Sequence, residues 1–311
     1  MQAERNGKLT GEAQRAAAGT ALASPPAPFE VYAIRYATVE RRGAENFIGG
    51  DPHESASRMD YFVWLARRGA ETYLIDTGFN EAAARRRKRE FLRSPLAGLA
   101  ALGVSGSAVT EVILTHLHYD HVGNFDLFPE ARFHLQDREL AYATGRHMGT
   151  KFFSAAYEVD EVTAMVRNVY DGRVRFHAGD TELAPGLSVH LIGGHTQGLQ
   201  VVRLWTRVGW LVLASDASHY TANRELASPF PVVADVTAMV EGWRRLEELA
   251  SAPRFIVPGH DPAVMRQYRA PAAALEDVAV RLDAEPELES LARPRAGRRS
   301  AAAQRRSRRA R

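Results

Sequence analysis

Apolar residues along the chain occur mainly in short stretches, either alternating with polar residues or continuous, and such stretches predict β-strands. The first begins at Phe29 and includes Val31 and Ala33. Residues 59–66 and 71–76 lie on either side of an Arg-Arg-Gly-Ala turn and predict a β-hairpin. Further strands are expected at residues 111–115, 132–136, 174–176, 187–191, 199–205, 209–214 and 254–257.

Segments between and after these strands predict helices. They lie at residues 81–93, within 99–109, and at 138–144, 152–167, 235–249, 262–268 and 272–282. Residues 41–57 form a polar, glycine-containing connection with Phe47 and Ile48 at its middle.

The strand expected at residues 111–115 ends in the sequence Thr-His-Leu-His-Tyr-Asp-His, which spans residues 115–121. On an extended segment that leaves a strand, residues i and i+2 point to the same side. His116 and His118 can therefore present two neutral nitrogens to one cation. Asp120 and His121 follow where the chain turns and can reach a second cation, roughly 3.5–4 Å from the first. Because these residues supply only part of a metal shell, further His and Asp are expected at the ends of later strands.

Three later strands end in such residues. His195 follows Gly-Gly, Asp216 follows the apolar strand at 209–214, and His260 follows Pro-Gly. A carboxylate at the edge of an apolar strand needs a charged partner, which a metal ion provides. The candidate metal ligands are therefore His116, His118, Asp120, His121, His195, Asp216 and His260. The histidines at positions 53, 134, 147, 177 and 190 lack this context and are expected to be surface or packing residues.

Composition narrows the chemistry further. The chain of 311 residues is 45% hydrophobic and 25% charged, which is ordinary for a globular protein. No run approaches the 18 or so apolar residues of a membrane span. The absence of cysteine excludes disulfides and thiolate ligands, and it leaves His, Asp and Glu to bind metal. We expect a cytoplasmic protein that does not associate with membranes.

The formal net charge of +3 is distributed unevenly. Nine of the 40 basic residues are arginines in residues 293–311, so the remainder has 31 basic against 37 acidic residues, a charge of −6. We expect an Ala-rich disordered leader at residues 1–28, one domain at 29–284, and a basic disordered tail at 285–311. Binding of this tail to anionic surfaces or nucleic acid is the alternative to a merely solvated tail.

These motifs together resemble the metallo-β-lactamase superfamily and, within it, the N-acyl homoserine lactone lactonases. The resemblance covers roughly residues 29–282 and rests on Thr-His-Leu-His-Tyr-Asp-His at 115–121, Gly-Gly-His at 193–195, Ser-Asp-Ala at 215–217 and Pro-Gly-His at 258–260. It implies an α/β fold, a four-layered αβ/βα sandwich with the site at one edge between two sheets. It also implies that His195 joins the first metal, that His260 joins the second, and that Asp216 bridges both.

The resemblance implies a hydrolase that opens the lactone ring of an N-acyl homoserine lactone or related ester, with two divalent metal ions, zinc first among them. A hydroxide held between the metals would attack the carbonyl, and Asp120 would assist departure of the alkoxide. Lactonases of this kind place a tyrosine three residues after the bridging aspartate. Here that position is His219 and the tyrosine is Tyr220, so either side chain is a candidate to polarise the substrate carbonyl.

Three other functions use similar ligands. A thioesterase resembling glyoxalase II usually has a further helical domain, for which about 50 residues after His260 leave little room. A phosphodiesterase or nuclease could use the arginine tail to hold phosphate, in which case deleting the tail would weaken binding in a salt-dependent way. A structural metal module would have closed coordination. The expected partner is a small lactone or ester rather than nucleic acid, and the residues do not decide between a monomer and a homodimer.

Overall fold

The computed structural model describes residues 25–50 and 57–287. The expected leader and basic tail therefore lie almost wholly outside the described residues, as does His53. Eight strands form the larger sheet, in the order β13-β1-β2-β3-β5-β6-β7 with β4 paired to β1. They are β1 (Glu30–Arg41), β2 (Ser57–Arg68), β3 (Glu71–Ile75), β4 (Glu90–Phe91), β5 (Glu111–Ile113), β6 (Arg132–Gln136), β7 (Val174–His177) and β13 (Ala279–Arg281).

The smaller sheet has five strands in the order β12-β11-β10-β9-β8. They are β8 (Thr181–Ala184), β9 (Leu187–Leu191), β10 (Gln200–Thr206), β11 (Gly209–Ser215) and β12 (Ile256–Pro258). Strands β8 to β11 pair antiparallel, whereas β12 runs parallel to β11. In the larger sheet, β3, β5, β6 and β7 are parallel, so their carboxyl ends meet at one edge.

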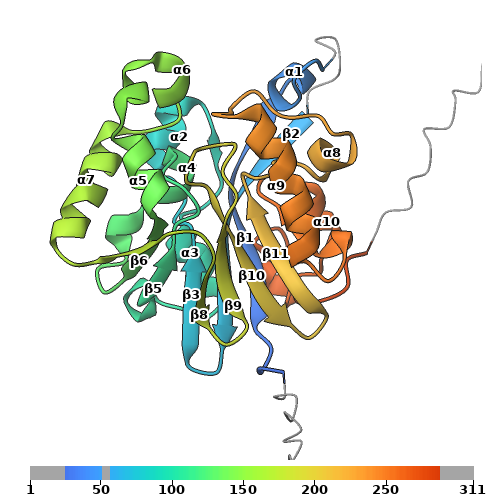
Figure 1. Cartoon of the computed structure of the whole chain (residues 1–311). Helices are drawn as coiled ribbons and strands as arrows, with labels where there is room; N and C mark the ends of the chain where they lie inside the picture. The colour runs from blue at the N-terminus through green and yellow to red at the C-terminus, as the bar shows by residue number, and fades with distance from the viewer. Residues whose placement is uncertain (1–24, 51–56, 288–311) are drawn as a thin grey trace, which may run out of the picture.

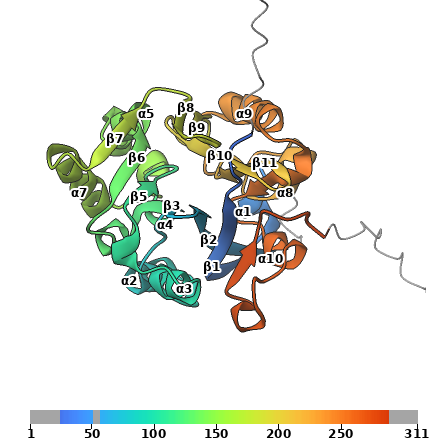
Figure 2. The same cartoon turned by 90° about the horizontal axis from the view of Figure 1, so that it is seen from below.

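Helices cover the outer face of each sheet (Figures 1 and 2). Those on the larger sheet's side are α2 (Glu81–Arg87), α3 (Pro95–Ala101), α4 (Tyr119–Val122), α5 (Asp137–Ala143), α6 (Lys151–Ser154) and α7 (Val159–Tyr170). Those on the smaller sheet's side are α8 (Thr221–Glu225), α9 (Val236–Leu249) and α10 (Ala263–Gln267), and α1 (Gly43–Asn46) follows β1. Short 3-10 turns lie at Gly106–Ala108, Phe125–Leu127, Arg146–Gly149, Pro253–Phe255 and Ala273–Leu275.

The alternation of apolar residues along the strands explains the layers. In β1, Val31 and Ala33 pack between the two sheets, whereas Ile34 packs against the helices of the larger sheet. In β11, Leu213 faces the space between the sheets and Val212 faces α9. Strands buried on both faces contribute to two cores at once. The four-layered αβ/βα sandwich expected from the sequence is therefore confirmed.

Three expected helices are different in the structure. The helix expected at 81–93 ends at Arg87, because Lys88 adopts a left-handed conformation (φ 55°) and the chain continues into β4. The helix expected at 152–167 is two helices, α6 and α7. The segment between them bonds to α4, since the Tyr119 amide donates to the Ala156 carbonyl (2.9 Å). The segment expected as a helix at 272–282 is a 3-10 turn followed by β13, because pairing with the edge of β1 outweighs its weak helical pattern.

The two sheets are tied together at the edge where the polar strand ends lie. The Gln200 amide at the start of β10 donates to the Thr115 carbonyl (3.0 Å), and its side chain donates to the Leu114 carbonyl (2.8 Å). The hydroxyls of Thr115 and Ser215 are 2.9 Å apart. These bonds fix the end of β5 against the end of β11. Within the described residues, no helix has the length and apolar character needed to cross a membrane.

Candidate metal centre

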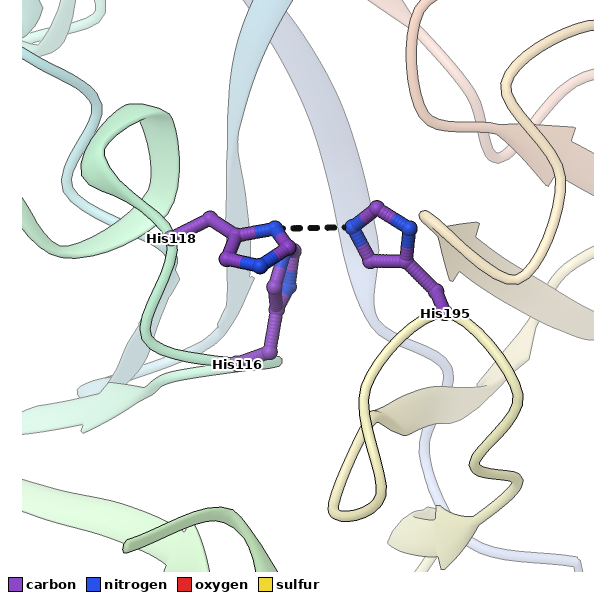
Figure 3. Close-up of side chains that lie close together, drawn as sticks. All are labelled: His116, His118 and His195. Atoms are coloured by element: carbon purple, nitrogen blue, oxygen red, sulfur yellow. Dashed lines mark hydrogen bonds between the residues drawn. The ribbon is translucent and has the colours of Figure 1, made fainter. Parts of the chain in front are cut away.

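Three histidines from two loops converge at this edge. His116 and His118 follow β5, and His195 follows β9; Figure 3 shows their rings turned toward a common point. His118 Nδ1 lies 3.1 Å from His116 Nε2 and 2.9 Å from His195 Nε2. Ligands around a tetrahedral zinc at about 2.0–2.1 Å are separated by about 3.3 Å. This group, called the first triad, therefore has nearly the spacing of a metal shell.

Asp120, His121 and His260 form a second triad beside the first. His121 Nε2 lies 3.9 Å from Asp120 Oδ1, and His260 Nε2 lies 3.9 Å from Asp120 Oδ2. Each triad consists of side-chain atoms that are all close enough together to hold one ion. The structure thus brings His116 and His118 together with His195, and Asp120 and His121 together with His260, while His116 and His121 also form a group with Asp216.

Asp216 lies between the triads. Its Oδ1 is 3.3 Å from His121 Nε2 and 3.0 Å from His260 Nε2. Its Oδ2 is 3.3 Å from His195 Nε2. The two oxygens of one carboxylate therefore face two different groups of imidazoles, as a bridging ligand would.

The buried polar atoms of the two triads and Asp216 have the properties expected of metal ligands. His121 Nε2 and Asp216 Oδ1 are buried without a hydrogen-bond partner, although buried polar atoms are nearly always paired. Burial and the neighbouring imidazoles hold the pKa of His116 and His118 well below the usual value, so these rings are neutral and have lone pairs for a metal. The donor set of His and Asp nitrogens and oxygens suits a borderline divalent cation.

The family follows from this site and from the fold that carries it. Residues 58–271 match the family model described as the metallo-β-lactamase superfamily. The chain belongs to the metallo-β-lactamase superfamily.

Two kinds of relative agree with this membership. The N-acyl homoserine lactonase AiiB of Agrobacterium fabrum is 33% identical over 129 residues, which are 40% of this chain and 46% of the relative. The chain thus spans about half the length of this curated relative. The crystal structure of a quorum-quenching N-acyl homoserine lactone lactonase has a TM-score of 0.67 at 21% identity, with coverage of 79% of this chain and 98% of that one. The dizinc quorum-quenching lactonase AidC has a TM-score of 0.59 at 18% identity, with 75% and 88% covered. These structural likenesses show the metallo-β-lactamase fold.

The nitrogens of the histidines that face away from the centre are fixed by hydrogen bonds. His195 Nδ1 lies 2.6 Å from the Val232 carbonyl, and His260 Nδ1 lies 2.9 Å from the Asp60 carbonyl. A carbonyl only accepts, so both rings carry a proton on Nδ1 and turn Nε2 inward.

Asp76 orients His121 in the same way, by accepting a hydrogen bond from Nδ1. This role of Asp76 was not predicted from the sequence. Its carboxylate lies 2.7 Å from His121 Nδ1 and accepts from the Thr115 amide (2.7 Å) and hydroxyl (2.8 Å). Burial opposes a charge on His121, but the carboxylates of Asp216, Asp76 and Asp120 outweigh it and raise the pKa of the ring. A signal was present: Asp76 ends a buried strand and precedes Thr-Gly, the same context that identified Asp216.

Glu139 is a second residue that sequence reasoning missed. This buried carboxylate accepts from the Leu117 amide (2.9 Å) and from the Thr196 hydroxyl (2.6 Å). It thereby connects the loop that carries His118 with the loop that carries His195. Tyr157 also donates to it (3.1 Å). Nothing in the local pattern of α5 distinguishes Glu139 from a surface glutamate.

A cavity of about 620 Å³ opens onto both triads. Its wall includes His118, Asp120, Asp216 and His219, and Phe152 lines it from α6. His219 Nε2 lies 2.9 Å from Asp216 Oδ2, and His219 also lies close enough to His195 and Asp216 to share an ion with them. Burial lowers the pKa of His219 to about 3, so its ring is neutral and donates Nε2–H to Asp216.

Tyr220 lies elsewhere. Its hydroxyl donates to the Arg58 carbonyl (3.1 Å), and its ring packs 5.9 Å from that of Phe47 in the core of the larger sheet. The residues lining the cavity include His219 but not Tyr220. Phe152 lines the cavity, whereas Phe47 packs against Tyr220.

The remaining described histidines lie outside the cluster. His134 stacks on His177 and its Nε2 lies 2.9 Å from Glu111, whereas His190 pairs with Asp180 (2.9 Å). His147 packs on the ring of Tyr142.

Proposed function

We propose that this protein is a metal-dependent hydrolase that opens the lactone ring of a small molecule, such as an N-acyl homoserine lactone or a related ester. It would hold two divalent metal ions, most simply zinc, in the first and second triads, with Asp216 between them. The observation that carries the proposal is this pair of triads sharing one carboxylate on the wall of one cavity. The lactonase names of AiiB and AidC support the substrate class.

The bound metals would polarise the ester carbonyl and lower the pKa of water at the site toward about 7. The chain's own residues supply positioning. The bonds of His195 and His260 to backbone carbonyls, and of His121 to Asp76, hold a proton on the outer Nδ1 of each ring, so that Nε2 faces the proposed metal positions.

Asp120 is placed to handle the leaving group. Its carboxylate lies at the cavity wall and 3.9 Å from both histidines of its triad, so it can reach a substrate atom without leaving the site. We assign it the transfer of a proton from the attacking water to the alkoxide that departs when the ring opens.

Of His219 and Tyr220, which follow Asp216 in the sequence, His219 is better placed to act at the proposed metal centre. It lines the cavity, whereas the Tyr220 hydroxyl is bonded to the Arg58 carbonyl. Because the Nε2–H of His219 donates to Asp216, we assign His219 the positioning of the bridging carboxylate.

The test is a hydrolysis panel of lactones, thioesters and phosphodiesters on metal-loaded protein, with metal analysis of the same sample. We expect lactone turnover together with two bound metal equivalents. The variants His116→Ala and Asp120→Ala should lose at least about a hundredfold in turnover and retain a folded domain by circular dichroism. His190→Asn removes a histidine outside the cluster and serves as the matched control. Full turnover after metal removal would refute the mechanism.

The same panel separates the rival functions. Preferred cleavage of thioesters would favour a glyoxalase II-like thioesterase. Preferred cleavage of phosphodiesters, with affinity lost in a salt-dependent way after deletion of residues 288–311, would favour a nuclease.

A further inference from the structure

The cavity beside the triads is lined by basic side chains that have no acidic partner within residues 25–50 and 57–287. Arg41, Arg89 and Lys151 line the same cavity as His118 and Asp120. Among the described residues, none of these three has a carboxylate oxygen within 4.0 Å of its charged nitrogens. Arg87 on the same wall differs because it has a carboxylate partner, and its Nη2 lies 2.9 Å from Glu158 Oε1.

Arg89 is held in place by neutral groups. Its Nε donates to the Tyr119 hydroxyl (3.2 Å), and its Nη1 donates to the Arg87 carbonyl (2.8 Å). The side chain is half-buried. A guanidinium has five donor hydrogens in a fixed fork, and these contacts use only part of them. Arg89 is therefore a preoriented cation, and its remaining donors have no acceptor among the residues that the structure describes.

Arg41, at the end of β1, has similar contacts. Its Nη2 donates to the Glu45 carbonyl (3.0 Å) and its Nη1 contacts the Met59 sulfur (3.2 Å). Lys151 begins α6, which lies at the same end of the molecule as α1 (Figure 1). Three cations from three separate segments of the chain thus line this one cavity.

The acids of this cavity offset these cations only in part, because Asp120, which stabilises the charge of Arg89, also belongs to the proposed metal centre. The two carboxylates on its wall, Asp120 and Asp216, belong to the proposed metal centre. Loading of two divalent ions would add more positive charge than these carboxylates neutralise. A partly desolvated cation without a counter-ion is costly, so an incoming anion would gain more here than in water.

The rest of the wall is apolar. Met59, Phe152 and Val232 line the cavity, with Ala155 and Pro231 beside them. A ligand that combines a short apolar chain with an anionic end would match both parts of the wall.

We propose that the substrate is an ester or lactone that carries an additional anionic group, a carboxylate or phosphate, bound by Arg89 with Arg41 and Lys151. The inference rests on the proposed hydrolase function and specifies its substrate class. Guanidinium groups bind both anions through paired hydrogen bonds.

The test compares lactones that differ only in charge. N-hexanoyl and N-adipoyl homoserine lactone have acyl chains of equal length, but a carboxylate replaces the terminal methyl in the second. A third lactone with a terminal phosphonate distinguishes a preference for phosphate from one for carboxylate. Because the charge is remote from the ring, intrinsic reactivity is the same for all three. We expect kcat/KM to be about 10–100-fold higher for an anionic lactone.

Arg89→Gln should reduce this ratio by about tenfold or more, whereas a purely structural defect would lower turnover of every lactone and leave the ratio unchanged. Arg85→Gln removes the same charge from an exposed Arg-Glu pair on α2 and is the matched control. Lys151→Gln, at an exposed position, should reduce the ratio in the same direction without affecting folding. The preference should also weaken with added salt.

Two results would separate this inference from the proposed function. Equal turnover of neutral and anionic lactones, or a ratio that Arg89→Gln and Lys151→Gln both leave unchanged, would overturn the inference while lactone hydrolysis stands. Failure to cleave any of the three lactones in metal-loaded protein would instead overturn the proposed function.

Discussion

Replacing Asp76 with asparagine tests how the protein controls the metal-facing nitrogen of His121. The carboxylate accepts three hydrogen bonds, from the Thr115 amide (2.7 Å), the Thr115 hydroxyl (2.8 Å) and His121 Nδ1 (2.7 Å). In either orientation, the asparagine amide would present an N–H group to at least one of these donors. The least costly response is for His121 to accept at Nδ1 and move its proton to Nε2.

That response places a proton on the atom that faces the metal site, because His121 Nε2 lies 3.3 Å from Asp216 Oδ1. The metal must then displace this proton and restore the original tautomer. Loss of such an outer partner typically costs about 10–100-fold in metal affinity or activity, which is about 1.4–2.8 kcal/mol. The loss of a charge-assisted hydrogen bond in the buried site should lower the free energy of unfolding by about 1.5–3 kcal/mol.

Competition between the protein and a chelator measures the affinity, and thermal melting of metal-free protein measures the stability. Asp76 has a positive φ of 60°, which asparagine tolerates and alanine does not, so Asp76→Asn changes the hydrogen bonds while it keeps the backbone. Asp277→Asn is the control, because Asp277 has the same φ of 60° but is exposed and pairs with Arg35 rather than with a histidine of the triads. Metal affinity of Asp76→Asn within about twofold of the parent would refute this role for Asp76.

Three further predictions concern pH and the residues near the site. The pKa of His121 and His260 is raised by nearby carboxylates against the effect of burial. Protons therefore compete with metal at the second triad, and metal analysis at falling pH should show its ion leaving before that of the first triad. Simultaneous loss of both ions would contradict this. Tyr220→Phe removes the bond to the Arg58 carbonyl. It should cost about 1 kcal/mol in unfolding free energy but change lactone turnover less than about threefold; a hundredfold loss would place the phenol in the reaction. Burial raises the pKa of Glu161 from 4.5 to about 8 in the folded chain, so stability is lost as pH rises through this interval. As pH rises from about 5 to 9, the melting temperature of Glu161→Gln should therefore increase relative to that of the parent. A difference between the two melting temperatures that stays constant would show that Glu161 does not titrate in this range.

The position of the site could be predicted because its ligands follow a simple rule. His116, His195 and His260 each lie in the loop that follows a strand, and the ends of these strands meet at one edge of the sandwich. The strands themselves were predictable, since residues such as Val212 and Leu213 alternate between two cores.

Other parts depend on contacts that no local pattern records. Strands β8 and β13 are short and exist because a neighbouring strand offers an edge, with Ala33 paired to Val280 in the case of β13. The role of Glu139 requires that α5 lie between two loops that are far apart in sequence. The choice between His219 and Tyr220 depends on which way each side chain turns, and adjacent positions in a sequence do not contain that information.

The close approach of the two loops around Asp216 gives a physical reason for the Pro-Gly-His motif. A Cβ atom at Gly259 would lie 2.7 Å from the backbone carbonyl of Ser215 and 2.8 Å from Asp216 Oδ1, closer than real Cβ contacts allow. Glycine lets β12 pass directly beside the carboxylate, so that the next residue, His260, reaches Asp216 Oδ1 at 3.0 Å. Ser215 adopts a positive φ of 44°, which turns the chain so that Asp216 leaves β11 toward the triads. The motif is therefore required by backbone distance as much as by the chemistry of histidine, and the strain at Ser215 is located where the bridging carboxylate is positioned.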